Sequence, residues 1–162
     1  MHQSGGVRLS FGEPDQPALG GWGGPTDPVP LNDGNFLRLS ASLYLVETAE
    51  GVRMKVRNSS YQYQLDRDGK QWLFRYDYLR IPPGLEPGAH LQISGQLAIY
   101  NTPLARLRFP TGRVTLEAVI RLLSDQFGVP CNEPPELWRP VLAESEKLFL
   151  EIAHQPGRAD TA

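Results

Sequence analysis

Two polar and aromatic stretches lie close together near the middle of the chain. The first reads Tyr61-x-Tyr63-Gln64 and the second reads Phe74-Arg75-Tyr76-Asp77. Cleavage of RNA without a metal needs a base for the 2′-hydroxyl proton, an acid for the leaving oxygen and a cation for the charge that develops on phosphorus. Side chains of these types are present, and the candidate catalytic residues are Tyr63, Arg75, Asp77 and His90.

Each of these residues has a chemical and a structural interpretation. In the chemical one, His90 or Asp77 is the base, Arg75 or Arg80 holds the phosphate, and a tyrosine of the first stretch donates a hydrogen bond. In the structural one, Arg75 and Asp77 are two residues apart on a strand, share a face and pair with each other. His90 then simply begins a strand after a loop. Both interpretations stay open at the level of sequence.

Residues 61–90 resemble the core hairpin of the TumE-like toxins of bacterial toxin–antitoxin pairs. The resemblance lies in the order of three features: Tyr-x-Tyr-Gln, a turn with an acidic residue and glycine, and Phe-Arg-Tyr-Asp. The resemblance implies an RNA-targeting protein of a toxin–antitoxin or defence system, with a cognate antitoxin as partner. In that family the Arg-Tyr-Asp motif is followed by Asn-Ala and a histidine cluster. Here the chain continues Tyr78-Leu79-Arg80-Ile81-Pro82-Pro83, and only His90 follows the loop. A binding relative without catalysis therefore stays open.

Period-two alternation predicts the strands that position these residues. Their ranges are Phe36–Glu47, Val52–Arg57, Tyr61–Asp66, Trp72–Tyr78, His90–Ile99 and Ala105–Phe109. The polar run 58–60 indicates either a bulged continuation or a new strand. Asp68-Gly69 predicts a hairpin turn, because this pair tolerates the positive φ of tight turns.

From residue 114 the hydrophobic period changes to 3.6, which predicts helices. The first helix has Thr115 as N-cap and Gly128 just past its end. The second is framed by prolines at 134, 135 and 140, and its predicted buried face is Val141, Leu142, Ser145, Leu148, Phe149 and Ile152. The predicted fold is α+β: an antiparallel meander sheet of five to six strands with two C-terminal helices packed on one face.

Glycine and proline divide the chain of 162 residues. Residues 1–35 hold 8 of the 16 Gly and 5 of the 15 Pro, so we interpret them as an N-terminal arm with one short strand at most. The predicted single domain is 36–155, followed by a tail over 156–162. No apolar run is long enough to cross a bilayer. With one cysteine and no signal-peptide core near residue 1, we expect a cytoplasmic protein and no membrane partner.

The net charge of −2 conceals an uneven distribution. Residues 36–121 carry 12 Lys and Arg against 7 Asp and Glu, whereas the segments on both sides are acidic. A basic sheet with interleaved tyrosines is typical of single-stranded RNA binding, although ordinary solvated strands also alternate in this way. The candidate nucleic-acid-binding residues are Arg53, Lys55, Arg57, Tyr61, Tyr76, Arg80, Arg106 and Arg108. The alternative function is a non-enzymatic protein-interaction or adaptor domain.

Other motifs point to no cofactor and no metal. The chain lacks a Walker-type loop, a dinucleotide fingerprint and a nucleophile elbow, and its one cysteine excludes a multi-cysteine zinc site. Thr111-Gly112-Arg113 either holds an anion at a helix N-terminus or makes a turn into the helix. Cys131 is expected to be a partly buried, inert thiol.

Overall fold

The computed structural model describes residues 8–11, 27–49, 51–80, 84, 87–97, 102–103 and 107–153. Most of the predicted arm and all of the predicted tail lie outside these ranges, so the domain boundaries stay predictions. Among the described residues, no helix combines the length and the apolar character needed to cross a bilayer.

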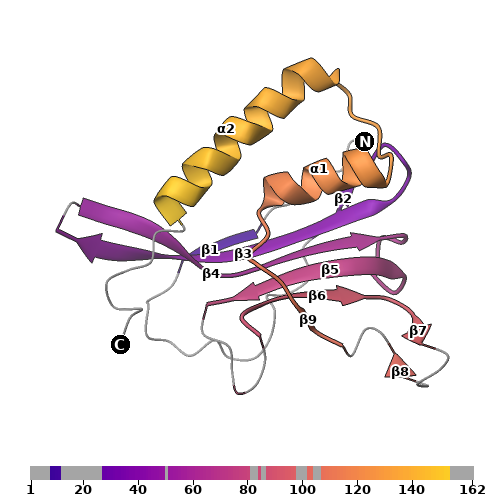
Figure 1. The fold of residues 1–162 in the computed structure, drawn as a ribbon, viewed down its shortest axis with the longest axis horizontal. Helices are drawn as coiled ribbons and strands as arrows, with labels where there is room; N and C mark the ends of the chain where they lie inside the picture. The colour runs from indigo at the N-terminus through magenta and orange to yellow at the C-terminus, as the bar shows by residue number, and fades with distance from the viewer. Residues whose placement is uncertain are drawn as a thin grey trace.

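The sheet is built around a meander of four consecutive strands. These are β3 (Phe36–Thr48), β4 (Gly51–Gln64), β5 (Trp72–Leu79) and β6 (Ala89–Ile93), each antiparallel to the next. The other strands are β1 (Arg8–Phe11), β2 (Val29–Pro30), β7 (Gln96–Leu97), β8 (Thr102–Pro103) and β9 (Phe109–Pro110). In the main sheet the order is β1-β3-β4-β5-β6-β9, with β2 also paired to β3 (Figure 1). The α+β prediction is confirmed, and β1 adds a parallel edge.

The long hairpin of β3 and β4 resolves the alternatives left open at residues 58–60. The two strands pair along their whole lengths, and the register shifts next to the Ser42–Leu43 step. A bulge there lets one strand continue through the polar run. In the second hairpin, Gly69 has φ of +76°, which confirms the predicted turn at this residue.

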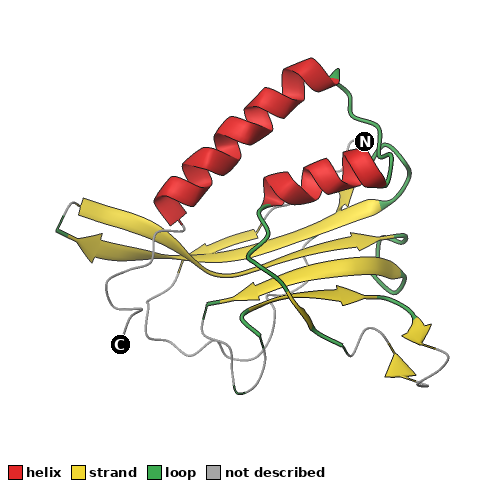
Figure 2. Ribbon diagram, viewed as in Figure 1, coloured by secondary structure: helices red, strands yellow, loops and turns green. Residues whose placement is uncertain are grey.

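Both helices lie on the same side of the sheet (Figure 2). In α1 (Leu116–Gln126), the Thr115 side chain accepts a hydrogen bond from the Ala118 amide, and Gly128 follows the helix with φ of +67°. Both predicted end signals of this helix are therefore confirmed. Val119 and Leu123 of α1 are buried against strand residues, and this cluster is the main core: Leu37, Leu39, Tyr61, Tyr63, Phe74, Val119, Leu123 and Val129.

Helix α2 (Pro135–Ala153) meets the sheet only near its C-terminal end (Figure 1). Phe149 packs against the second core cluster, formed by Leu43 and Val56. The predicted buried face is therefore only partly correct, because Val141, Ser145 and Leu148 are exposed.

Glu146 of α2 binds two residues of the α1 segment, and its ionisation makes the stability of this contact depend on pH. Its carboxylate accepts hydrogen bonds from Thr115 at 2.6 Å and from Arg121 at 2.5 Å. The Thr115 hydroxyl, and then the Arg121 guanidinium, hold the pKa of Glu146 below its usual value of 4.5 despite partial desolvation. A lowered folded-state pKa stabilises the fold above about pH 4.5, and this contribution disappears as the pH falls through the folded-state value.

We expect Glu146→Gln to flatten the decline in the free energy of unfolding between about pH 5 and pH 3, as measured by urea denaturation. The exposed Glu144, on the same helix, supplies the control, and Glu144→Gln should follow the wild-type decline. An equally steep decline in Glu146→Gln would contradict this assignment.

The segment 27–35 contacts both the sheet and the α1–α2 connection. Val29 pairs with Leu37 of β3, and the Asn32 side-chain amide donates to the Pro130 carbonyl at 2.9 Å and to Asn132 at 2.8 Å. The C-terminal end of the predicted arm therefore packs against the domain. The expectation of one short strand at most in residues 1–35 is wrong, because β1 and β2 both lie there and both pair with β3.

Candidate functional site

Three of the four candidate catalytic residues meet on the face of the sheet opposite the helices. Asp77 of β5 lies directly across from Ser60 of β4 and His90 of β6. Its carboxylate accepts hydrogen bonds from the Ser60 hydroxyl and from Arg75 Nε, each at 2.7 Å. His90 Nε2 is 3.7 Å from Asp77 Oδ2. Arg75 also donates to the Gln92 side-chain oxygen. We call these five residues the Asp77 cluster.

The Asp77 cluster is mostly shielded from solvent. Asp77 is 3% exposed and His90 is 4% exposed, whereas the Arg75 side chain keeps 31% of its surface. His90 Nδ1 is 3.1 Å from the Pro87 carbonyl, so both ring nitrogens have protein neighbours. Arg75 and Asp77 therefore pair with each other, as the structural interpretation expected, and Arg75 is the member that solvent reaches best.

Tyr63 lies on the other face of the sheet and does not join the Asp77 cluster. Its hydroxyl donates to Asp33 at 2.6 Å and accepts from the Asn35 side-chain amide at 2.8 Å. Burial, together with the hydrogen bond to the Asp33 carboxylate, raises the pKa of Tyr63. Desolvation acts to raise the pKa of Asp33, but its hydrogen bonds with Tyr63 and Asn35 outweigh this and lower it. Tyr63 therefore anchors the segment 27–35, and the sheet separates it from Arg75, Asp77 and His90.

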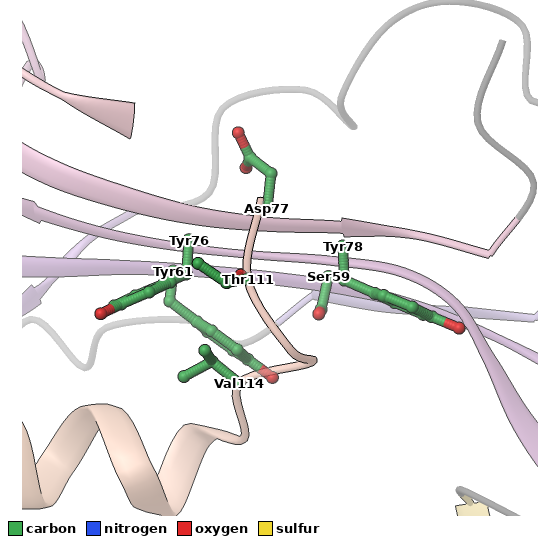
Figure 3. A pocket seen from close by; sticks show the side chains of 7 residues that line it. All are labelled: Ser59, Tyr61, Tyr76, Asp77, Tyr78, Thr111 and Val114. Atoms are coloured by element: carbon green, nitrogen blue, oxygen red, sulfur yellow. The ribbon is translucent and has the colours of Figure 1, made fainter. Parts of the chain in front are cut away.

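Tyr61 and Tyr76 also face the helices. Tyr61 belongs to the core and is 9% exposed, and burial raises its pKa. The Tyr76 ring packs against Phe74 with ring centroids 5.6 Å apart. Figure 3 shows Tyr61 and Tyr76 on the side of the sheet where Val114 lies, while the Asp77 side chain points to the opposite side. The space between the lining residues is too small for a water molecule. Stacking of a base on Tyr61 does not fit this placement.

A different tyrosine lies among the predicted basic residues. Tyr44 of β3 is directly across from Lys55 of β4. The guanidinium carbons of Arg57 and Arg80 are 5.7 and 5.9 Å from the centre of its ring, and Arg80 Nε also donates to the Val56 carbonyl at 3.0 Å. We call Tyr44, Lys55, Arg57 and Arg80 the Tyr44 patch. The sequence contained a signal for Tyr44, because it is the aromatic residue on the polar side of the alternating segment 36–47.

The remaining predicted basic residues are placed less fully. Arg108 is exposed between β8 and β9. Arg106 lies outside the described residues, and of Arg53 only the backbone position in β4 is described. The described side chains therefore do not form one basic stripe across the whole sheet. Among the predicted basic residues, those of the Tyr44 patch lie next to an aromatic ring.

Residues 111–113 belong to the short connection between β9 and α1. The Arg113 guanidinium lies 4.6 Å from the centres of both the Tyr78 and the Phe149 rings. Burial lowers the pKa of Arg113. This arginine is thus a packing element between β5 and α2, which favours the turn over the anion-site interpretation.

The described part of the chain shows no metal-binding cluster, and it places the one cysteine differently from the expectation. No group of three or more His, Cys, Asp or Glu side chains is arranged there to hold a metal ion. Cys131 is exposed, contrary to the partly buried position expected, and lies 3.6 Å from the Ser124 hydroxyl.

Comparison with known proteins adds no relative. No protein-family model, curated protein or solved structure matches this chain.

Proposed function

We propose that the protein binds single-stranded RNA through the Tyr44 patch, as a toxin-like module of a bacterial toxin–antitoxin or defence system. The observation that carries the binding proposal is the position of two guanidiniums within 6 Å of one tyrosine ring, with Lys55 on the neighbouring strand. Proteins that bind single-stranded nucleic acid combine aromatic rings for bases with cations for phosphates. The resemblance in the hairpin supplies the biological setting.

The residue types of the Tyr44 patch and their spacing both suit a nucleotide. A nucleotide beside the Tyr44 ring would have its phosphate close to Arg57 and Arg80, because both guanidinium carbons lie within 6 Å of the centre of that ring. Arg suits this role because its planar fork matches phosphate oxygens and stacks on aromatic groups. The patch residues are only partly buried, unlike Tyr61 and Tyr63.

Binding without cleavage is the form that the burial of the Asp77 cluster supports. A general base must come within hydrogen-bond reach of the 2′-hydroxyl, and His90 is 4% exposed. Cleavage is the second candidate, supported by the convergence of Arg75, Asp77 and His90 on one face. It predicts that the RNA becomes shorter during incubation and that His90→Gln prevents this.

The test is fluorescence anisotropy with a labelled single-stranded RNA at about 50 and about 200 mM salt. Three cations that contact phosphate give a slope of log affinity against log salt near −2, hence about 20-fold weaker binding at the higher salt. Lys55→Gln with Arg57→Gln should reduce the slope to about −0.7, because one phosphate contact remains. Tyr44→Val should weaken binding about tenfold through lost stacking, and Tyr44→Phe should not.

A variant of equal charge provides the control. Lys70 and Lys147 are exposed and lie outside the Tyr44 patch, so Lys70→Gln with Lys147→Gln removes the same two charges. This variant should keep the wild-type salt slope. If it weakens RNA binding as much as the patch variant does, or if no RNA binds at about 50 mM salt, the proposal fails.

A further inference from the structure

Within the described ranges, the contacts of helix α2 with other elements lie along one side of the helix. Phe149 reaches the sheet, where Arg113 lies against its ring. Four side-chain hydrogen bonds join α2 to α1: Glu146 accepts from Thr115 and Arg121, Ser145 donates to Glu117, and Arg139 donates to Asp125. Polar side chains thus join the two helices, and large apolar side chains of α2 are left outside this contact.

Three of these apolar side chains share one side of α2. Leu137 is 57% exposed, Val141 is 67% exposed and Leu148 is 46% exposed. At 3.6 residues per turn, spacings of four and seven residues place all three in one row along the helix. We call this row the α2 stripe. An ordered row of large exposed apolar side chains is typical of a surface that binds another protein.

The carboxylates beside the α2 stripe indicate the chemistry of its partner. Glu144 and Glu151 follow one border of the row on the helical wheel, about 40–60° from its centre. On the other border, Ser145 is hydrogen-bonded to Glu117 of α1 at 2.6 Å. Lys147 projects about 100° away from the row. The stripe is therefore apolar with acidic borders on both sides.

We propose that the α2 stripe docks a basic amphipathic helix of a partner protein. Apolar side chains at positions i, i+4 and i+11 suit a second helix laid along α2, and Lys or Arg on that helix would meet the acidic borders. A second copy of this chain fits less well, because antiparallel packing of two α2 helices centred on the stripe brings Glu144 close to its own counterpart. This proposal does not rest on RNA binding.

The probes are two synthetic amphipathic peptides with identical leucine positions, one with lysine and the other with glutamate on the polar face. We expect the full-length chain to bind the lysine peptide at least about tenfold more tightly than the glutamate peptide, as measured by fluorescence anisotropy. Val141→Gln with Leu148→Gln should weaken binding of the lysine peptide about tenfold or more. Glutamine keeps helix propensity high, so α2 should remain folded, which circular dichroism checks.

The same helix offers matched controls. Leu150 is also apolar and 42% exposed, but it lies on another side of α2, so Leu150→Gln should leave peptide affinity unchanged. Glu144→Gln with Glu151→Gln should weaken binding of the lysine peptide, whereas Glu136→Gln should leave its affinity unchanged. RNA binding should not respond to any of these changes.

Three results would overturn the proposal. The first is failure of the lysine peptide to bind. The second is an equal loss of affinity in Leu150→Gln and in the stripe variant. The third is a concentration-dependent dimer on sizing that Val141→Gln with Leu148→Gln dissociates, because a second copy would then be the occupant.

Discussion

Asp77→Ala should lower the free energy of unfolding by about 2–4 kcal/mol. The Asp77 carboxylate is nearly inaccessible to solvent and accepts from Ser60 and Arg75, so its removal leaves both donors without this acceptor. Breaking a fully buried ion pair costs more, but the Arg75 side chain is 31% exposed and water can replace part of the interaction. Urea denaturation monitored by tryptophan fluorescence measures this difference.

Asp68→Ala is the matched control for the loss of a carboxylate. Asp68 pairs with Lys70, and both side chains are well exposed, so the change in stability should stay within about 0.5 kcal/mol. If Asp77→Ala were as stable as the wild type, the cluster would have no structural role. A catalytic role for Arg75, Asp77 and His90 would then gain support.

Gly69→Ala is expected to destabilise the protein by about 2–3 kcal/mol. Gly69 has φ of +76°, which strains any residue with a Cβ atom. An added Cβ would also lie 3.1 Å from Gln62 Nε2 and 3.1 Å from Gln64 Oε1. These glutamines cannot easily move, because they bond to each other, and Gln64 donates to the carbonyls of Asp66 and Arg67 in the same turn.

Gly34→Ala separates the cost of backbone strain from the cost of contacts with the added Cβ atom. Gly34 has φ of +84°, and an added Cβ would meet nothing within 4 Å, so only backbone strain of about 1 kcal/mol applies. Equal losses of stability in the two variants, measured by thermal or urea unfolding, would show that the Gln62–Gln64 pair does not restrict residue 69.

Much of the fold follows from local patterns in the sequence. The alternation in residues 36–47 and 72–78, the Asp68-Gly69 turn and the Thr115 cap each act through neighbouring residues, and the corresponding elements are present. The parallel pairing of β1 with β3 has no such local signal, because it joins residues 32 positions apart through an intervening segment rich in glycine and proline.

The candidate site was only partly predictable, and the reason is the pairing register. Alternation places Arg75 and Asp77 on one face of the sheet. Tyr63 would share that face only if it paired with Arg75 or Asp77, that is, if the register between β4 and β5 were shifted by an odd number of residues. Tyr63 pairs with Phe74 instead and enters the core. His90 comes next to Asp77 through the pairing of β5 with β6, across a loop whose length alone does not set that register.

The exposure of the α2 stripe was not predictable from its period. A period of 3.6 shows that α2 has an apolar side, but the tilt of the helix decides whether the sheet covers that side. Arg113 lies between Tyr78 and Phe149 and joins the C-terminal end of α2 to the sheet. Polar contacts join α2 to α1. Leu137 and Val141, nearer the N-terminal end of α2, are consequently left outside the core. Leu148 is exposed although it is next to Phe149 in sequence, because neighbouring residues of a helix point about 100° apart.

The meander also determines how the chain can assemble. From β3 to β6 each strand pairs with its immediate neighbour along the sequence, so these ladders close short loops, which is entropically cheap and kinetically fast. Helix α2 follows all of these strands and reaches back to β3 and β4 through Phe149. No ladder from β3 to β6 needs α2 in order to close, so we expect the α2–sheet contact to form late in folding, once the native surface for Phe149 exists.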